Sequence, residues 1–181
     1  MSATPSTPPS VVIVMGVSGS GKTTIAALLA GVLHWELADA DAFHPATNIE
    51  KMRNGIPLTD EDRSPWLHAI SVWIDAVRAA RRHGIVACSA LKRAYRQILI
   101  GDRRDVQLVY LSGNFELIAH RMAMRHEHFM PLALLQSQFD TLEPPGPDEH
   151  PLTVSIDASP QEIAAMIVAA LRLQGTEQQV T

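Results

Sequence analysis

Short apolar runs alternate along the chain with segments in which apolar residues recur every three or four positions. The short runs, which have the form of strands buried on both faces, cover residues 11–15, 35–38, 85–90, 106–111 and 152–156. The periodic segments, which have the form of amphipathic helices, cover residues 22–33, 65–83, 92–100, 114–125, 131–142 and 160–173. Strands and helices that alternate in this order predict an α/β fold, in which a parallel sheet carries helices on both faces.

Polar residues mark where several of these helices are expected to begin. Two segments have the spacing of a capping box, Thr47-x-x-Glu50 and Ser159-Pro160-Gln161-Glu162, and the second also has proline at the first helical position. Asn114 and the pair Ser64-Pro65 are further predicted helix starts.

The length of 181 residues favours one domain. We expect that domain to cover residues 10–175, between a disordered tail at residues 1–9, which is rich in Ser, Thr and Pro, and a second tail at residues 176–181. A hydrophobic content of 46% and a charged content of 19% are typical of a soluble globular protein. The single cysteine, Cys88, lies in an apolar run, so we expect a reduced core residue without a disulfide.

Charge and hydropathy exclude two classes of partner. The net charge is −4 and there is no block of basic residues, whereas a nucleic-acid-binding protein needs a basic surface. No segment approaches about eighteen consecutive apolar residues, and the start of the chain lacks the charged and apolar parts of a signal peptide. We therefore predict a cytoplasmic protein that binds neither nucleic acid nor membranes.

The run Gly16–Thr23, with the sequence GVSGSGKT, fits the P-loop pattern G-x-x-x-x-G-K-[ST] at every position. A Gly- and Ser-rich turn could match by chance, but this run follows a predicted strand and opens a predicted helix, as a phosphate-binding loop does. It predicts a bound nucleoside triphosphate with Mg²⁺, because Lys22 would reach the outer phosphates and the Thr23 hydroxyl would ligate the metal. The residues expected to bind the nucleotide are Gly16, Val17, Ser18, Gly19, Ser20, Gly21, Lys22, Thr23 and Thr24.

Two carboxylates, Asp39 and Asp41, follow the second predicted strand. Ligands of such sheets bind beyond the carboxyl ends of the strands, so we expect this pair to face the nucleotide. Beside a metal–nucleotide complex, one carboxylate can hold the water shell of the metal while the other accepts a proton from an attacking hydroxyl. The alternative is an acidic loop that caps the next helix; the neighbouring P-loop favours the catalytic interpretation.

Cations occur at three further places near the expected site. Lys92 and Arg93 lie at the start of a predicted helix, where the helix dipole opposes positive charge, so we expect them to bind an anion. Arg63, beside acidic residues, either forms surface ion pairs or faces the cleft. Arg121 and Arg125 share one face of a helix end; they either close over the transferred phosphoryl group as part of a lid or complement the helix dipole.

Seven short motifs together resemble the thermoresistant-type gluconokinases. They are GVSGSGKT from residue 16, DADAFHP from 39, NIEKM from 48, GIPLTDEDR from 55, PWL from 65, CSALK from 88 and QFDTLE from 138. The resemblance covers nearly the whole chain, from about residue 11 to residue 173. It implies transfer of the γ-phosphoryl group of ATP to the terminal hydroxyl of D-gluconate, giving 6-phosphogluconate. It also implies a nucleoside-monophosphate-kinase-like three-layer fold, a five-stranded sheet of order 2-3-1-4-5, a mobile lid at about residues 120–132 and a homodimer.

The resemblance also implies roles for particular residues. By analogy with the related shikimate kinases, Asp39 lies near the metal with Thr23, and Asp41 meets the substrate hydroxyl. Arg63 falls near the position of a carboxylate-binding arginine in those enzymes. The residues expected to bind gluconate are Asp41, His44, Arg63 and Lys92.

The lid stretch departs from the family pattern, because His126-Glu127-His128 stands where a Lys-Gly-His-like sequence is expected. These histidines lack the spacing of a metal site, so we predict no zinc. Within the lid we expect Arg121 to bind ATP, and we expect Arg125 to act in catalysis together with Lys22 and Asp41.

Two other functions fit parts of the sequence. A kinase for another small polyol or sugar acid would share the P-loop and the carboxylate pair. A nucleotide-dependent switch would turn over slowly whether or not a sugar acid is present, but no switch motif is recognisable and the carboxylate pair suits a hydroxyl acceptor better. We expect gluconate to be a far better substrate than sorbitol, because sorbitol lacks the carboxylate that would pair with the cations.

Overall fold

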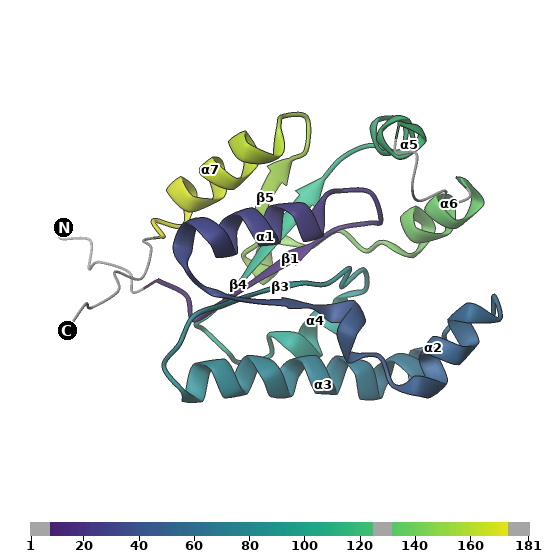
Figure 1. The fold of residues 1–181 in the computed structure, drawn as a ribbon, viewed down its shortest axis with the longest axis horizontal. Helices are drawn as coiled ribbons and strands as arrows, with labels where there is room; N and C mark the ends of the chain where they lie inside the picture. Colours follow the sequence, from purple (N-terminus) through teal and green to yellow (C-terminus); the bar gives the residue numbers. More distant parts are fainter. Residues whose placement is uncertain (1–7, 125–131, 174–181) are drawn as a thin grey trace.

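A computed structural model of the chain describes residues 8–124 and 132–173, and at its centre is a sheet of parallel strands (Figure 1). The strands are β1 (Val11–Met15), β2 (Glu36–Asp39), β3 (Gly84–Ala87), β4 (Val106–Ser112) and β5 (Leu152–Ser155). Their order is β2-β3-β1-β4-β5, which confirms the order that the resemblance implies. Because β1 lies in the middle, the loop that follows it opens at the centre of the edge where the carboxyl ends of the strands meet.

Helices cover both faces of this sheet, as predicted. The helices α1 (Lys22–Leu33) and α7 (Pro160–Ala170) pack on one face, and α3 (Asp60–Ala79) and α4 (Arg93–Leu99) pack on the other (Figure 1). Beyond the carboxyl ends of the strands lie α2 (Ala46–Arg53), α5 (Phe115–Ala123) and α6 (Leu132–Thr141). Two short 3-10 helices, η1 (Ala40–Phe43) and η2 (Pro147–Glu149), lie in connecting loops.

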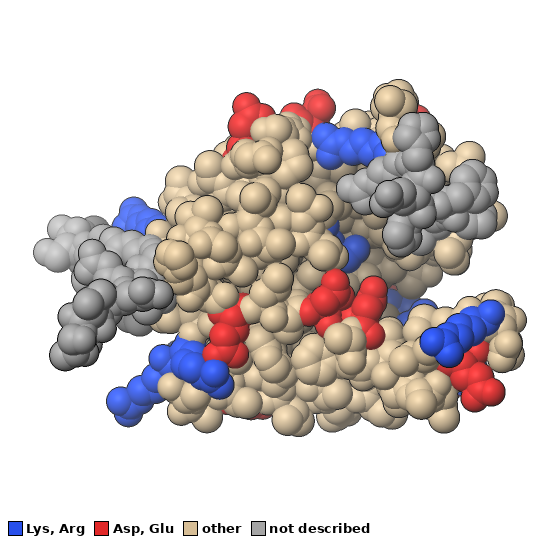
Figure 2. All heavy atoms as spheres, viewed as in Figure 1, with Lys and Arg blue, Asp and Glu red and all other residues tan. Residues whose placement is uncertain are grey.

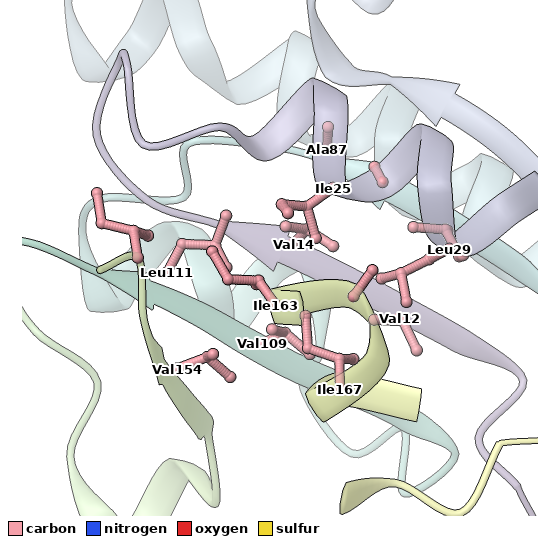
Figure 3. Close-up of a cluster of buried hydrophobic side chains, with 14 of the residues drawn as sticks. Val12, Val14, Ile25, Leu29, Ala87, Val109, Leu111, Val154, Ile163 and Ile167 are labelled. Atoms are coloured by element: carbon pink, nitrogen blue, oxygen red, sulfur yellow. The ribbon is translucent and has the colours of Figure 1, made fainter. Parts of the chain in front are cut away.

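Two clusters of buried side chains join the sheet to its helices. Alternate residues of β1 belong to different clusters, because successive side chains of a strand point to opposite faces. Val12 and Val14 pack under α1 and α7, whereas Ile13 packs against α3. Figure 3 shows the first cluster, in which Ile25 of α1 and Ile163 of α7 meet the strands. All residues of β1 have no exposed surface, so the strand that leads into the P-loop is rigidly held.

The predicted start of α3 at Ser64-Pro65 is wrong, since the helix begins at Asp60. Thr59 and Asp62 form the capping box: the Thr59 hydroxyl accepts from the Asp62 N–H at 3.2 Å, and the Asp62 carboxylate accepts from the Thr59 N–H at 3.0 Å. Pro65 is the sixth residue of the helix, where it has no N–H to donate to the Glu61 carbonyl one turn earlier. The true start therefore lies five residues before the predicted one, and Arg63 lies within the helix.

The predicted capping box at Thr47 and Glu50 is also wrong. Both residues lie inside α2, whose N-cap position is Pro45 without a capping side chain. The Ser159 capping box and the start at Asn114 are confirmed. The other strands and helices overlap the predicted segments with ends shifted by a few residues; notably, β3 ends at Ala87, so the residues up to 91 form a loop.

Before β1, Pro9, the last residue of the predicted tail, and Ser10, the first of the predicted domain, contact residues elsewhere in the chain. The Ser10 N–H donates to the Asp105 carbonyl at 2.7 Å, and the Pro9 carbonyl lies 3.0 Å from His83 Nδ1. Residues 1–7 and 174–181 lie outside the described ranges. As predicted, Cys88 is a buried core residue. Within residues 8–124 and 132–173, none of the helices has the length and apolar character needed to cross a membrane.

Candidate active site

The run Gly16–Thr23 forms a loop between β1 and the first residue of α1, as the P-loop pattern predicts. Gly19 and Gly21 have φ angles of 79° and 95°, in the left-handed region that favours glycine. The Lys22 ammonium folds back over the loop and donates to the Val17 carbonyl at 3.1 Å. Because α1 begins at Lys22, within the run Gly16–Thr23, its first turn adjoins the loop. The free N–H groups of that turn and the helix dipole favour a bound anion.

A cavity of about 300 Å³ opens beside this loop, and we call it the phosphate cavity. It brings together residues from four separate parts of the chain: the P-loop, the end of β2, the loop after β3, and α6. The lining residues that matter here are Lys22, Thr23, Asp39, Asp41, Ser89 and Gln138. The predicted phosphate-binding and carboxylate residues therefore share one cavity.

Asp39 occupies the junction between β2 and η1. One of its carboxylate oxygens lies 3.3 Å from the Thr23 hydroxyl, and the other accepts from the Asp41 N–H at 3.0 Å. Asp41, two residues later, is exposed at the cavity. Neither carboxylate caps α2, so the alternative of an acidic loop that caps the next helix is wrong for α2, although Asp39 does cap η1.

Burial changes the pKa of two residues around the phosphate cavity. Loss of solvent lowers the pKa of Lys22, while neighbouring negative charges, among them Asp41 and Asp39, oppose this shift. Loss of solvent raises the pKa of the Cys88 thiol to about 12. Cys88 is therefore protonated at neutral pH and is no nucleophile, although it lines the cavity.

Next to the cavity, the starts of α3 and α4 bring together the side chains of Asp60, Arg63, Lys92 and Tyr95, which we call the acceptor cluster. The Lys92 ammonium lies 3.0 Å from both carboxylate oxygens of Asp60, and the Tyr95 hydroxyl donates to Asp60 at 2.5 Å. The Arg63 guanidinium lies 4.0 Å from the same carboxylate and 5.9 Å from the centre of the Tyr95 ring. These contacts lower the pKa of Asp60, first through its hydrogen bonds with Tyr95 and Lys92.

His44 lies between the carboxylate pair and the acceptor cluster. Its ring stacks on Trp66 with the centroids 4.5 Å apart, and the Trp66 indole N–H donates to the Ala40 carbonyl at 2.6 Å. Loss of solvent lowers the pKa of His44, with the Asp41 carboxylate opposing the shift and the Arg63 guanidinium adding to it. In Figure 2, acidic and basic side chains lie close together around a recess near the middle of the face of the molecule that is shown.

The loop that presents Lys92 is held by a buried guanidinium. Arg96 is only 1% exposed; it donates to the carbonyls of Ala90 and Leu91 and forms an ion pair with Glu149 at 2.6 Å. Arg93, predicted together with Lys92 to bind an anion, instead pairs with Asp148. The structure thus separates the two predicted cations: Lys92 belongs to the acceptor cluster and Arg93 does not.

A second cavity, of about 470 Å³, lies on the other side of the P-loop. Arg121 at the end of α5 lines it together with Thr24 and Ser159, and the Arg121 guanidinium lies 3.5 Å from the Ala158 carbonyl. Arg121 also lies in the last turn of α5, where the helix dipole favours a positive charge, so both interpretations of this residue stay predictions. Arg125 and most of the predicted lid at about residues 120–132 lie outside the described residues.

Sequence reasoning missed several residues of this site. Asp60 and Tyr95 complete the acceptor cluster, and Trp66 orients His44. Asp60 lies in the GIPLTDEDR motif and Trp66 in the PWL motif, so the resemblance could have marked these two, whereas Tyr95 lies three residues after the CSALK motif. Gln138 could have been found, because it opens the QFDTLE motif that carries part of the family resemblance.

Comparisons with known proteins agree with this geometry. A family model described as an AAA domain matches residues 11–145. A probable gluconokinase from Mus musculus is 44% identical over 91% of this chain and 98% of its own length. The thermoresistant gluconokinase of Escherichia coli strain K12 is 39% identical over 90% of this chain and 93% of its own length.

Solved structures show the same fold. The crystal structure of a gluconokinase from Sinorhizobium meliloti 1021 is 41% identical and superposes with a TM-score of 0.82, over 91% of this chain and 92% of that chain. The shikimate kinase from Aquifex aeolicus, at 16% identity, covers 90% of this chain and 96% of its own with a TM-score of 0.55, and shares the fold alone.

Proposed function

The chain belongs to the gluconokinase family of P-loop kinases, and on that premise we propose that it transfers the γ-phosphoryl group of ATP to the terminal hydroxyl of D-gluconate. The product is 6-phosphogluconate. The observation that carries the proposal is the single cavity in which the P-loop, Lys22 and the pair Asp39 and Asp41 meet. The acceptor cluster beside it supplies cations suited to a substrate with a carboxylate.

In this proposal the triphosphate lies along the P-loop, where main-chain N–H groups and the positive end of the α1 dipole bind its oxygens. Lys22 leaves the Val17 carbonyl and turns its ammonium toward the β- and γ-phosphates. There it neutralises the charge that gathers on ADP as the bond to the γ-phosphorus breaks.

Asp41 receives the proton of the attacking hydroxyl. A bond forms between the gluconate oxygen and the γ-phosphorus, the bond from that phosphorus to the ADP oxygen breaks, and the proton passes to the Asp41 carboxylate. Because Asp41 is exposed, it returns this proton to water after the product leaves.

Mg²⁺ fits the oxygen donors that Thr23 and Asp39 place close together, since hard cations prefer hydroxyl, carboxylate and water ligands. Thr23 would ligate it directly and Asp39 through its water shell. When bound, the ion supplies positive charge to the β- and γ-phosphate oxygens. Chelation with EDTA should therefore abolish turnover, and added Mg²⁺ should restore it.

The gluconate carboxylate binds Lys92 and Arg63, in place of the Asp60 carboxylate that faces them in the free protein. Charge-assisted hydrogen bonds of this kind are stronger than neutral ones. The lowered pKa of His44 makes its ring neutral at neutral pH, so His44 contributes a hydrogen bond to a substrate hydroxyl rather than positive charge. The adenosine part of ATP occupies the second cavity, against Arg121.

The experiment that tests this function measures ADP release with gluconate, with sorbitol and without an acceptor. We expect rapid, Mg²⁺-dependent turnover with gluconate alone, and phosphorus–proton NMR should place the phosphate on the terminal carbon. Slow turnover that is the same in all three reactions would instead indicate a nucleotide-dependent switch. Equal activity with gluconate and sorbitol would contradict the role of the cations.

The family resemblance also leads us to propose a homodimer. Sedimentation velocity should then give about twice the monomer mass of 19.8 kDa.

A further inference from the structure

Gln138 of α6 makes two hydrogen bonds with one residue of the P-loop. Its side-chain carbonyl accepts from the Ser18 N–H at 2.7 Å, and its side-chain NH₂ group donates to the Ser18 hydroxyl at 2.9 Å. The two residues are 120 positions apart in the sequence. Gln138 also lines the phosphate cavity together with Lys22 and Asp41, so the contact lies where the triphosphate is proposed to bind.

The chemistry of this contact selects a carboxamide of glutamine length. Ser18 offers one main-chain donor and one hydroxyl, and a carboxamide matches them with one acceptor and one donor. Glutamate at position 138 would keep the acceptor but lose the donor, and it would bring negative charge toward the phosphates. Asparagine would be one methylene too short to reach from the same helix position.

The helix that carries Gln138 is itself fixed to the core. Leu135, one helical turn earlier, is fully buried, and Phe139 packs edge-on against Phe115 of α5 with the ring centroids 5.7 Å apart. Gln136, on the same helix, is exposed and donates to Asp140 within α6. Gln138 thus contacts the P-loop from a helix that packs against the hydrophobic core.

The loop needs such support, because Gly19 and Gly21 have wide conformational freedom. A P-loop binds phosphate with main-chain N–H groups, so these groups must point into one concavity before the ligand arrives. We propose that Gln138 is a positioning residue for the triphosphate: by accepting from the Ser18 N–H it fixes that peptide, and so it holds the other main-chain N–H groups of the P-loop in their binding conformation. The inference rests on the proposed nucleotide site and adds a residue that acts through the loop.

The test is direct binding of ATP to Gln138→Leu and to the matched control Gln136→Leu, with thermal unfolding of both. Two hydrogen bonds of ordinary strength correspond to about a tenfold change, so we expect ATP to bind about tenfold more weakly to Gln138→Leu. The KM for gluconate should stay within about twofold, and Gln136→Leu should leave both values unchanged.

Ser18→Ala provides a second variant, which removes only the bond between the Gln138 NH₂ group and the hydroxyl. It should weaken ATP binding by about threefold, and it should have no further effect in the Gln138→Leu background, because the contact is already lost there. If Gln138→Leu does not fold, the ATP affinity of Ser18→Ala alone still tests the proposal.

Unchanged ATP affinity in Gln138→Leu, or additive effects of the two substitutions, would overturn the inference. A lower melting temperature with unchanged ATP affinity would show a merely structural contact and would also overturn it. Because ATP binding is measured without gluconate, the inference fails or holds separately from the proposed function.

Discussion

The proposed site has a phosphate half, which binds the triphosphate, and an acceptor half, which binds gluconate. Main-chain groups of one continuous run, Gly16–Thr23, supply most of the proposed ligands in the phosphate half, whereas side chains supply them in the acceptor half. Those side chains come from three segments: η1 with the residues around it, the start of α3 and the start of α4. The first half is set by the path of the backbone after a fully buried strand. The second half is set by how helices pack against one another.

This difference predicts how each half responds to substitution. A main-chain site depends on the path of its backbone, so substitutions should matter at Gly19 and Gly21, whose φ angles favour glycine, and at Lys22, which carries its mobile charge. A site made of side chains depends on a balance of charges, in which Asp60 neutralises Lys92 and Arg63 until a substrate carboxylate replaces it. Substitutions should therefore affect kcat where the two halves meet and the KM for gluconate in the acceptor half.

Asp41 lies where the halves meet, so its loss should have the largest effect. Asp41→Asn keeps the size of the side chain but removes the base, and we expect kcat to fall about 100- to 10,000-fold, with a smaller change in gluconate affinity. Asp39→Asn should instead raise the Mg²⁺ concentration needed for half-maximal rate. Normal turnover by Asp41→Asn in a coupled ADP assay would contradict the assignment, as would loss of turnover in Asp39→Asn without altered metal dependence.

Lys22→Ala should give the largest effect within the phosphate half. Removing one electrostatic stabiliser of the transferred group corresponds to a loss of about 100-fold or more in kcat. Circular dichroism should show an unchanged fold. Lys51→Ala is the matched control, because Lys51 pairs with Asp62 on α3 at 2.7 Å and does not line the phosphate cavity. If Lys22→Ala kept most of its activity, the P-loop assignment would be wrong.

Lys92→Ala and Arg63→Ala test the acceptor half. Each should raise the KM for gluconate about tenfold, because each removes a charge-assisted hydrogen bond to the substrate carboxylate, while the KM for ATP stays unchanged. The preference for gluconate over sorbitol should shrink accordingly. Arg93→Ala is the control: it removes a neighbouring cation that pairs with Asp148, and its effect on the KM for gluconate should be negligible.

Asp60→Asn should produce the smallest and most diagnostic change. Without the Asp60 charge, the substrate carboxylate no longer competes for Lys92 and Arg63, so we expect the KM for gluconate to fall about threefold. Glu61→Gln, which removes the neighbouring charge, should leave the KM unchanged. A higher KM in Asp60→Asn would mean that Asp60 positions Lys92 for the substrate instead of competing with it.

The two halves also differ in how much of them could be predicted from the sequence. The P-loop is local, so its residues, its strand and its helix follow from one motif, and the position of Asp39 and Asp41 follows from the rule that ligands bind at the carboxyl ends of strands. The start of α3 was missed because proline favours the first turn of a helix, whereas Thr59 and Asp62 form a capping box earlier in the chain.

The acceptor cluster could be predicted only in part, because its contacts join distant segments. Lys92 and Arg63 were identified as candidate cations, but Asp60 was indistinguishable from its acidic neighbours until α3 and α4 were placed side by side. Arg93 has the same sequence environment as Lys92, yet Asp148 draws it away. Which of two adjacent cations faces a site is decided by packing, and packing is absent from a local pattern.

The buried Arg96 has a consequence for the order in which the protein is made. A ribosome completes Arg96 well before Glu149, its partner 53 residues later. Burying a guanidinium without its counter-charge is unfavourable, so the loop of Ala90 and Leu91 that presents Lys92 settles only after residue 149 has left the ribosome. The nascent chain therefore has its P-loop sequence long before it has an acceptor half.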